Sequence, residues 1–174
     1  MLPHLPPQSK SLPEMLKEVE LLVLELEGTL TDGTVTVDHQ GNESFRLHHS
    51  DVTGLKTWLE SGGHLVVVAR QDLSGARAWC QAQGFNFRPH QGKKNVMLAP
   101  IIMEHQLESP QVCYLGAYLE DLPALMSAGV SAVPAQAPAW VRDAAHLVLE
   151  KPGGAGAVRE LVERLLDHKG FLGG

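Results

Sequence analysis

The sequence predicts an α/β protein built on a three-layer, doubly wound parallel sheet, with a β-hairpin inserted after the first strand. Apolar runs of strand length alternate with helical stretches along most of the 174 residues. These runs are continuous rather than alternating, which indicates strands covered by helices on both faces. One stretch breaks this rhythm and alternates apolar and polar residues around a turn, as a hairpin does. The 44% hydrophobic content is sufficient for one domain with its own core, expected over residues 21–170.

Six core strands are expected from the apolar runs, joined by helical segments in the βαβ succession that gives a parallel sheet. The expected strands are Leu21–Leu26, His64–Ala69, Phe85–Arg88, Val112–Leu115, Val130–Val133 and His146–Leu149. The expected helices are Asp51–Ser61, Leu73–Gln83, Lys94–Leu107, Leu119–Ser127, Pro138–Ala144 and Gly156–His168. Ligands of such sheets bind beyond the carboxyl ends of the strands.

The first 20 residues are predicted to be a flexible leader or linker outside the core. Their early part is rich in proline, which interrupts regular structure; the prolines are Pro3, Pro6, Pro7 and Pro13.

Composition excludes several classes of protein. A formal net charge of −6 and the lack of Lys/Arg runs argue against nucleic-acid and anionic-membrane surfaces. No apolar run reaches the length of a membrane span. Cys80 and Cys113 have no metal-ligand spacing, so buried, reduced thiols of a cytoplasmic protein are expected.

Two acids mark the end of the first strand. Glu25 and Glu27 are two residues apart, so on a strand their side chains point the same way and could share one site. Such a pair suits phosphoryl transfer. The simpler interpretation, two solvated carboxylates at a strand end, is favoured from the residues alone.

The hairpin is expected over Thr34–Leu47, directly after the acidic loop, where it could cover that loop or meet another subunit. Its two halves carry an apolar set that a monomer would leave partly exposed, which is typical of an interface. This set is Val35, Val37, Phe45 and Leu47.

The stretch from Glu25 to Gly33 resembles the first motif of the haloacid dehalogenase superfamily, Asp-x-Asp-Gly-x-x-Thr-Asp-Gly, and the resemblance extends to about Gly170. The subgroup it resembles contains 3-deoxy-manno-octulosonate 8-phosphate phosphatases and the C-terminal domain of animal CMP-sialic acid synthetases. It is carried by further short motifs in the family's order, namely the hairpin, His49–Gly54, Gln91–Gly92, Tyr114–Gly116, Asp121, Gly129–Ser131, Pro134–Ala135 and Gly153–Glu160.

The resemblance implies a Rossmann-like fold and a set of site positions, several of which have changed here. Glu25 stands at the nucleophile position and Glu27 at the general acid/base position, where the family has aspartate. The other changed positions are Ala69 for the phosphate-binding hydroxyl, Val96 for the phosphate-binding lysine, Gly116-Ala117-Tyr118 for an acidic metal-binding loop, and Ala155 for an arginine.

Replacement groups for the lost functions are few. Asp121 remains as a metal-ligand candidate, although an acid at a helix start is also explained by capping. Lys93 and Lys94 lie close enough to Val96 for one to substitute by a small shift in register, although a solvated helix start explains them equally. Gly154 belongs to a glycine run that could cradle an anion before the last helix, or simply lead into it.

The leading hypothesis is therefore a catalytically degenerate phosphatase domain that serves oligomerisation or regulation, plausibly in sialic acid activation. The resemblance implies a homotetramer built through the Thr34–Leu47 hairpin and, in a longer parent chain, an attached nucleotidyltransferase domain. No cofactor is then expected, and a nuclear location would follow only for such a longer animal enzyme. One alternative is a Mg²⁺-dependent phosphatase of an acidic sugar phosphate, with Glu25 as nucleophile. Another is a module that binds phosphate or a sugar acid without turnover.

Overall fold

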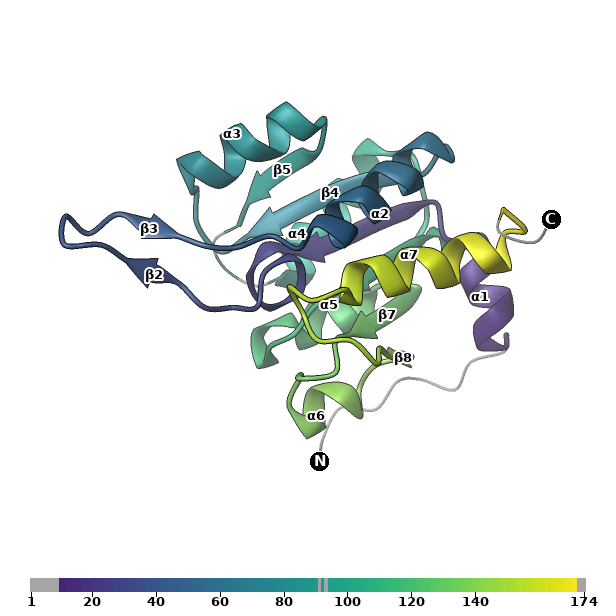
Figure 1. Cartoon of the computed structure of the whole chain (residues 1–174). Coiled ribbons are helices and arrows are strands. Elements are labelled where there is room, and N and C mark those ends of the chain that lie inside the picture. Colours follow the sequence, from purple (N-terminus) through teal and green to yellow (C-terminus); the bar gives the residue numbers. More distant parts are fainter. Residues whose placement is uncertain (1–9, 91, 93, 172–174) are drawn as a thin grey trace.

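The computed structural model describes residues 10–90, 92 and 94–171, and it confirms the predicted fold class (Figure 1). Six parallel strands form one sheet in the order β5-β4-β1-β6-β7-β8, so the first strand lies near the middle. The strands are β1 (Leu21–Glu25), β4 (His64–Ala69), β5 (Asn86–Pro89), β6 (Val112–Leu115), β7 (Val130–Val133) and β8 (Leu147–Val148).

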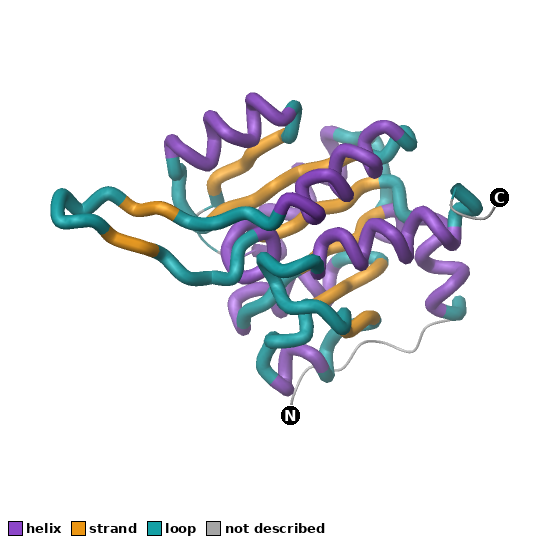
Figure 2. Tube along the Cα trace, viewed as in Figure 1, coloured by secondary structure: helices purple, strands orange, loops and turns teal. Residues whose placement is uncertain are grey.

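Helices cover both faces of the sheet, as the continuous apolar strands require (Figure 2). The helices are α1 (Leu12–Glu18), α2 (His49–Glu60), α3 (Ser74–Gln83), α4 (Lys94–Glu104), α5 (Leu122–Ser127), α6 (Ala139–Arg142) and α7 (Ala157–His168). One buried cluster joins the sheet to α1, α2, α3 and α7, and a second joins it to α4, α5 and α6. Among the described residues, no helix is both long and apolar enough to cross a bilayer.

The N-terminal region is more ordered than the sequence predicted. Helix α1 starts with a capping box, in which the backbone N–H of Ser11 donates to Glu14 at 2.7 Å. Met15 and Leu16 are buried in the core cluster shared with α7. The prediction of a flexible leader is therefore wrong for residues 12–18, whereas residues 1–9 lie outside the described part of the chain.

The hairpin is present where it was predicted and projects from the body of the molecule (Figure 1). Its strands β2 (Thr36–Val37) and β3 (Glu43–Ser44) are antiparallel, and Gly41 in the turn has a φ of +84°. The predicted apolar set divides into two pairs. Val35 and Val37 are 51% and 59% exposed, whereas the other two side chains, Phe45 and Leu47, pack against the core.

Both cysteines are buried free thiols, as expected. Burial raises the pKa of Cys80 to about 11 and that of Cys113 to about 12, so neither is a thiolate near neutral pH.

Candidate active site

The carboxyl ends of β1, β4 and β6 meet around a cavity of about 360 Å³, which is where a parallel sheet places its ligand site. Glu25 ends β1, and Glu27 follows in the tight turn formed by Leu26–Leu30. Both side chains line this cavity, as expected for two acids that could share one site. The complete lining consists of Glu25, Glu27, Gly33, Arg70, Lys94, Tyr118 and Glu120.

Glu25 is a buried carboxylate, only 2% exposed, and not the solvated group that the sequence favoured. Its Oε1 accepts a hydrogen bond from the Tyr114 hydroxyl at 2.7 Å and lies 2.7 Å from the Lys94 ammonium. Burial, followed by repulsion from Asp121, raises the pKa of Glu25 to about 7, although Lys94 and Tyr114 act in the opposite direction. Near neutral pH, a smaller fraction of Glu25 is consequently ionised than of an ordinary glutamate.

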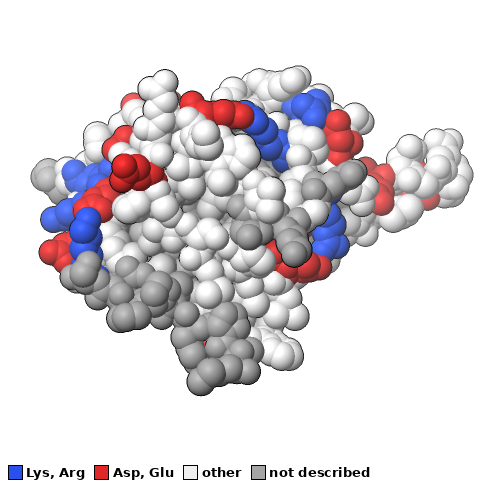
Figure 3. All heavy atoms as spheres, turned by 180° about the vertical axis from the view of Figure 1, so that it is seen from behind, with Lys and Arg blue, Asp and Glu red and all other residues white. Residues whose placement is uncertain are grey.

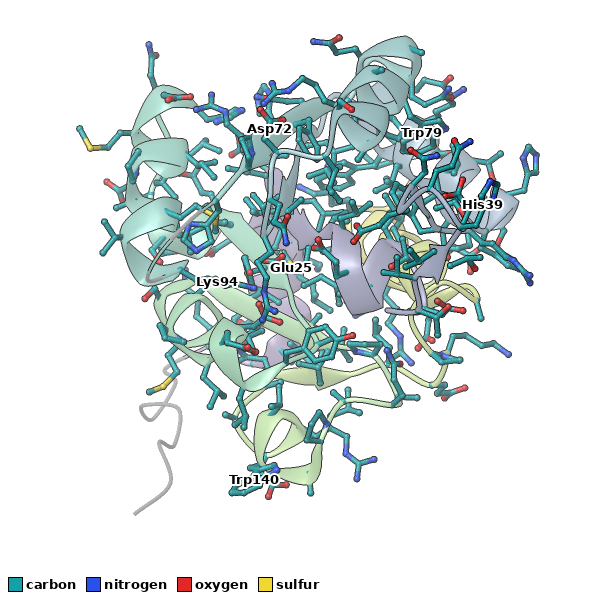
Figure 4. The ribbon with its side chains drawn as sticks, turned by 90° about the vertical axis from the view of Figure 1, so that its left-hand side faces the viewer. Glu25, His39, Asp72, Trp79, Lys94 and Trp140 are labelled. Carbon is teal, nitrogen blue, oxygen red and sulfur yellow. The ribbon has the colours of Figure 1, made fainter. Side chains whose placement is uncertain are left out.

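Lys94 is the lysine of this site, although the motif spacing assigned that position to Val96. It is the first residue of α4 and is 6% exposed, whereas Val96 points outward and is 66% exposed. The ammonium bridges Glu25 and Asp121, and Figure 4 shows its side chain beside that of Glu25. Burial lowers the pKa of Lys94, but the two carboxylates outweigh this effect and the net pKa is raised. The interpretation of Lys94 as a solvated helix start is therefore wrong; Lys93 lies outside the described residues.

Asp121 is a fully buried member of the same network rather than a simple helix cap. Its Oδ2 accepts hydrogen bonds from the backbone N–H groups of Ala117 and Tyr118 at 2.7 and 2.8 Å. Its Oδ1 contacts Lys94 and lies 3.3 Å from the Tyr114 hydroxyl. Asp121 begins α5 in sequence, but its side chain makes no cap bond to that helix. It instead fixes the loop after β6 and holds the lysine.

The rim of the cavity contains an ion pair and an aromatic ring. Arg70, next to the buried Ala69, lies 2.5 Å from Glu120 across the opening. The Tyr118 ring lies over the turn after β1, since a Cβ added at Gly33 would be 2.2 Å from the Tyr118 hydroxyl. Glu27 contributes a buried Oε2 that has no hydrogen-bond partner among the described residues.

Gly154 does not line the cavity, so its predicted role in substrate binding is not supported by its position. It has a φ of +66°, and its N–H donates to the Thr29 carbonyl at 2.9 Å. A Cβ at this position would lie 2.4 Å from the backbone nitrogen of Asp32. The glycine therefore permits close packing of the C-terminal loop against the turn after β1.

Several functional contacts were not predicted. The sequence places Tyr114 in a strand motif, and no local signal shows that its hydroxyl reaches Glu25 from the neighbouring strand. Asp51 was expected to begin the helix Asp51–Ser61, but its side chain caps α7, accepting from the N–H groups of Gly156 at 3.1 Å and Arg159 at 2.8 Å. Since these partners are more than 100 residues away, only the tertiary fold brings them together.

The donor groups do not fit a divalent cation. A protein Mg²⁺ site leans on carboxylate oxygens in near-octahedral geometry. Here the two buried carboxylates, Glu25 and Asp121, already bind the Lys94 ammonium, and Ala117 brings no oxygen from its side chain. Within the described residues, no group of three or more His, Cys, Asp or Glu side chains is arranged to hold a metal.

Comparisons with known proteins identify the family. No protein-family model matches the sequence. A probable YrbI family phosphatase from Pseudomonas syringae has a solved structure that is 31% identical and covers 92% of each chain with a TM-score of 0.87. This chain belongs to the YrbI-type phosphatases of the haloacid dehalogenase superfamily. The 3-deoxy-D-manno-octulosonate 8-phosphate phosphatase of Haemophilus influenzae is 27% identical over 158 residues, or 90% of this chain and 88% of that protein.

The relation to sialic acid activation is weaker and partial. N-acylneuraminate cytidylyltransferase A of Danio rerio is 29% identical over 150 residues, but the match covers only 35% of that protein. The 3-deoxy-D-manno-octulosonate 8-phosphate phosphatases match over most of their own length, so the comparisons favour the phosphatase alternative over the degenerate domain of a sialic acid enzyme. One such phosphatase, from Haemophilus influenzae, is known in a cobalt-bound form.

Proposed function

We propose that this YrbI-type chain is a catalytically degenerate phosphatase whose role is assembly or regulation rather than phosphomonoester hydrolysis. The observation that carries the proposal is the state of Glu25, at the nucleophile position. Its Oε1 is already bound by Tyr114 and Lys94, and its raised pKa leaves the carboxyl group partly protonated near neutral pH. A carboxyl group that is partly protonated and hydrogen-bonded is a poorer nucleophile than a free carboxylate.

Two further features support the loss of turnover. The extra methylene of glutamate moves the carboxylate relative to aspartate, and a displacement of about 1 Å can cost on the order of 100-fold in rate. Ala69 and Ala117 supply neither a hydroxyl nor a carboxylate, so the charge that develops on a transferred phosphoryl group lacks its expected partners. The proposal therefore includes no cofactor.

Assembly is proposed to proceed through the Thr34–Leu47 hairpin, giving a homotetramer. The support is the exposed pair Val35 and Val37, together with a groove of about 610 Å³ between the hairpin and the start of α3. Figure 3 shows the hairpin projecting from the body, with no Lys or Arg visible on its outer part. Attachment to a nucleotidyltransferase domain in a longer chain belongs to the same proposal, and the partial cytidylyltransferase match supports it only weakly.

Turnover is tested with an aryl phosphate and with 3-deoxy-manno-octulosonate 8-phosphate, in Mg²⁺ and separately in Co²⁺. We expect no hydrolysis above that of Glu25→Ala. Metal-dependent hydrolysis that disappears in Glu25→Ala would establish the second candidate function, a phosphatase of an acidic sugar phosphate. The full-length phosphatase relatives favour this second candidate, as does the presence of Lys94 in the cavity.

Assembly is tested by light scattering. The chain should be a tetramer at micromolar concentration, and Val37→Glu should yield smaller species because it places a charge in an apolar contact. Met103→Glu is the matched control, since Met103 is 76% exposed on α4, away from the hairpin. A monomeric native chain, or equal dissociation by both variants, would remove the hairpin proposal.

A further inference from the structure

The ammonium of Lys94 lies where a cation neutralises both buried carboxylates of the site, Glu25 and Asp121. It lies 2.7 Å from Glu25, it is also paired with Asp121, and its side chain is 7% exposed. We infer that Lys94 acts as a built-in counter-ion that substitutes for a divalent metal at this site. Two consequences follow: the native chain binds no divalent cation between Glu25 and Asp121, and removal of the lysine side chain creates a site that does.

Steric and electrostatic reasons exclude simultaneous binding. A divalent cation must lie about 2.0–2.6 Å from its carboxylate oxygens. An ion placed between Glu25 Oε1 and Asp121 Oδ1 would therefore overlap the position of the Lys94 nitrogen. Two cations of like charge in a buried site also repel each other strongly, because the local dielectric constant is low. The metal would have to displace an ammonium that is already desolvated and paired.

The remaining hydrogen bonds of the network occupy further oxygens that a metal ion would need. The second oxygen of Asp121 is taken by the N–H groups of Ala117 and Tyr118, and the Tyr114 hydroxyl donates to Glu25. Burial and the two carboxylates keep the Tyr114 hydroxyl protonated, because they raise its pKa well above its ordinary value. Without Lys94, two buried acids would face each other with no cation between them. That arrangement is strongly unfavourable unless a proton or a metal ion is taken up.

This inference concerns the site of the proposed function and rests on the same loss of metal-dependent turnover, but the two can fail separately. Hydrolysis by the native chain in a chelator would overturn the proposed function and leave the internal counter-ion intact. Binding of Mn²⁺ between Glu25 and Asp121 in the native chain without hydrolysis would overturn the internal counter-ion and leave the proposed function intact.

The test measures bound Mn²⁺ by electron paramagnetic resonance, and melting temperature with chelator or with millimolar Mn²⁺. The variants are Lys94→Ala, which opens the space, and the control Lys56→Ala on the exposed side of α2. The native chain and the control should bind no Mn²⁺ and should melt at the same temperature in both buffers. In chelator, Lys94→Ala should melt roughly 10 °C lower than the native chain, as expected for an unpaired buried charge. In Mn²⁺ it should bind about one ion and recover several degrees.

A second variant locates the ion. Adding Asp121→Asn to Lys94→Ala removes one carboxylate, so the recovery in Mn²⁺ should disappear. Stoichiometric Mn²⁺ binding by the native chain that is lost in Asp121→Asn would overturn the inference. So would a folded Lys94→Ala variant that does not respond to Mn²⁺. If Lys94→Ala does not fold in either buffer, the measurement on the native chain decides alone.

Discussion

The raised pKa of Glu25 predicts a measurable dependence of stability on pH, which Glu25→Gln should remove. The pKa of this group is about 7 in the folded chain against an ordinary value of 4.5. Between these two values the folded chain retains a proton that the unfolded chain has released. The free energy of unfolding contributed by Glu25 therefore falls as the pH rises from about 4.5 to about 7, and is level on either side.

The size of the effect follows from the shift. A difference of roughly 2.5 pKa units corresponds to about 3 kcal/mol, at 1.36 kcal/mol per unit. Since glutamine does not titrate, the free energy of unfolding of Glu25→Gln should gain about 3 kcal/mol relative to the native chain between pH 4 and pH 8. The offset at any single pH also contains the lost charge contact with Lys94, so only the slope is diagnostic.

Urea denaturation at several pH values, followed by tryptophan fluorescence, measures this difference. Glu43→Gln makes the same exchange on the exposed hairpin strand β3 and serves as the control. A difference curve for Glu25→Gln that stays level, or that falls with rising pH, would refute the burial argument. A rise of the expected size would establish that the site holds a protonated carboxyl in the acidic range.

Further substitutions test the supports around the site. Gly33→Ala should lower the free energy of unfolding by roughly 1–3 kcal/mol, because a Cβ at φ +80° is strained and would lie 2.2 Å from the Tyr118 hydroxyl. Urea denaturation measures this loss, and an unchanged unfolding midpoint would contradict the prediction. Tyr118→Ala should relieve the steric part of that cost, so the double variant should be less destabilised than the sum of the two single changes. Asp51→Ala should cost about 1–3 kcal/mol by leaving the N–H groups of Gly156 and Arg159 at the start of α7 unpaired; amide exchange confined to that turn would check the cause.

The sequence was most informative where a local pattern has only one structural solution. Continuous apolar runs predicted the central strands, and β4, β6 and β7 have the predicted bounds, because a strand buried on both faces leaves few polar positions. Alternating apolar and polar residues around a glycine turn predicted the hairpin, because such strands are covered on one face only. Helix α1 was missed because nearby prolines concealed a short apolar pattern whose burial depends on α7.

The site was predicted only in outline, since its chemistry depends on contacts between distant elements. The strand-end position of Glu25 is a local property and was correct. The assignment of the lysine position to Val96 assumed the motif spacing, whereas the start of α4 turns Lys94 into the cavity. The role of Tyr114 depends on the register of β6 against β1, which places Tyr114 beside Val23 and lets its hydroxyl reach Glu25. No spacing along the chain encodes that register.

The contacts that stabilise this site also oppose turnover. For Glu25 to attack a substrate through Oε1, that oxygen must first be released from Lys94 and Tyr114. Breaking a buried ion pair by removing one partner costs about 3–5 kcal/mol. A comparable cost, added to an activation barrier, slows a reaction by roughly two to four powers of ten. A ligand could offset this cost only by supplying its own bonds to Lys94, and Asp121 already competes for that ammonium. The network therefore favours a stable, closed site over a reactive one, which is why the presence of two strand-end acids is not by itself evidence of catalysis.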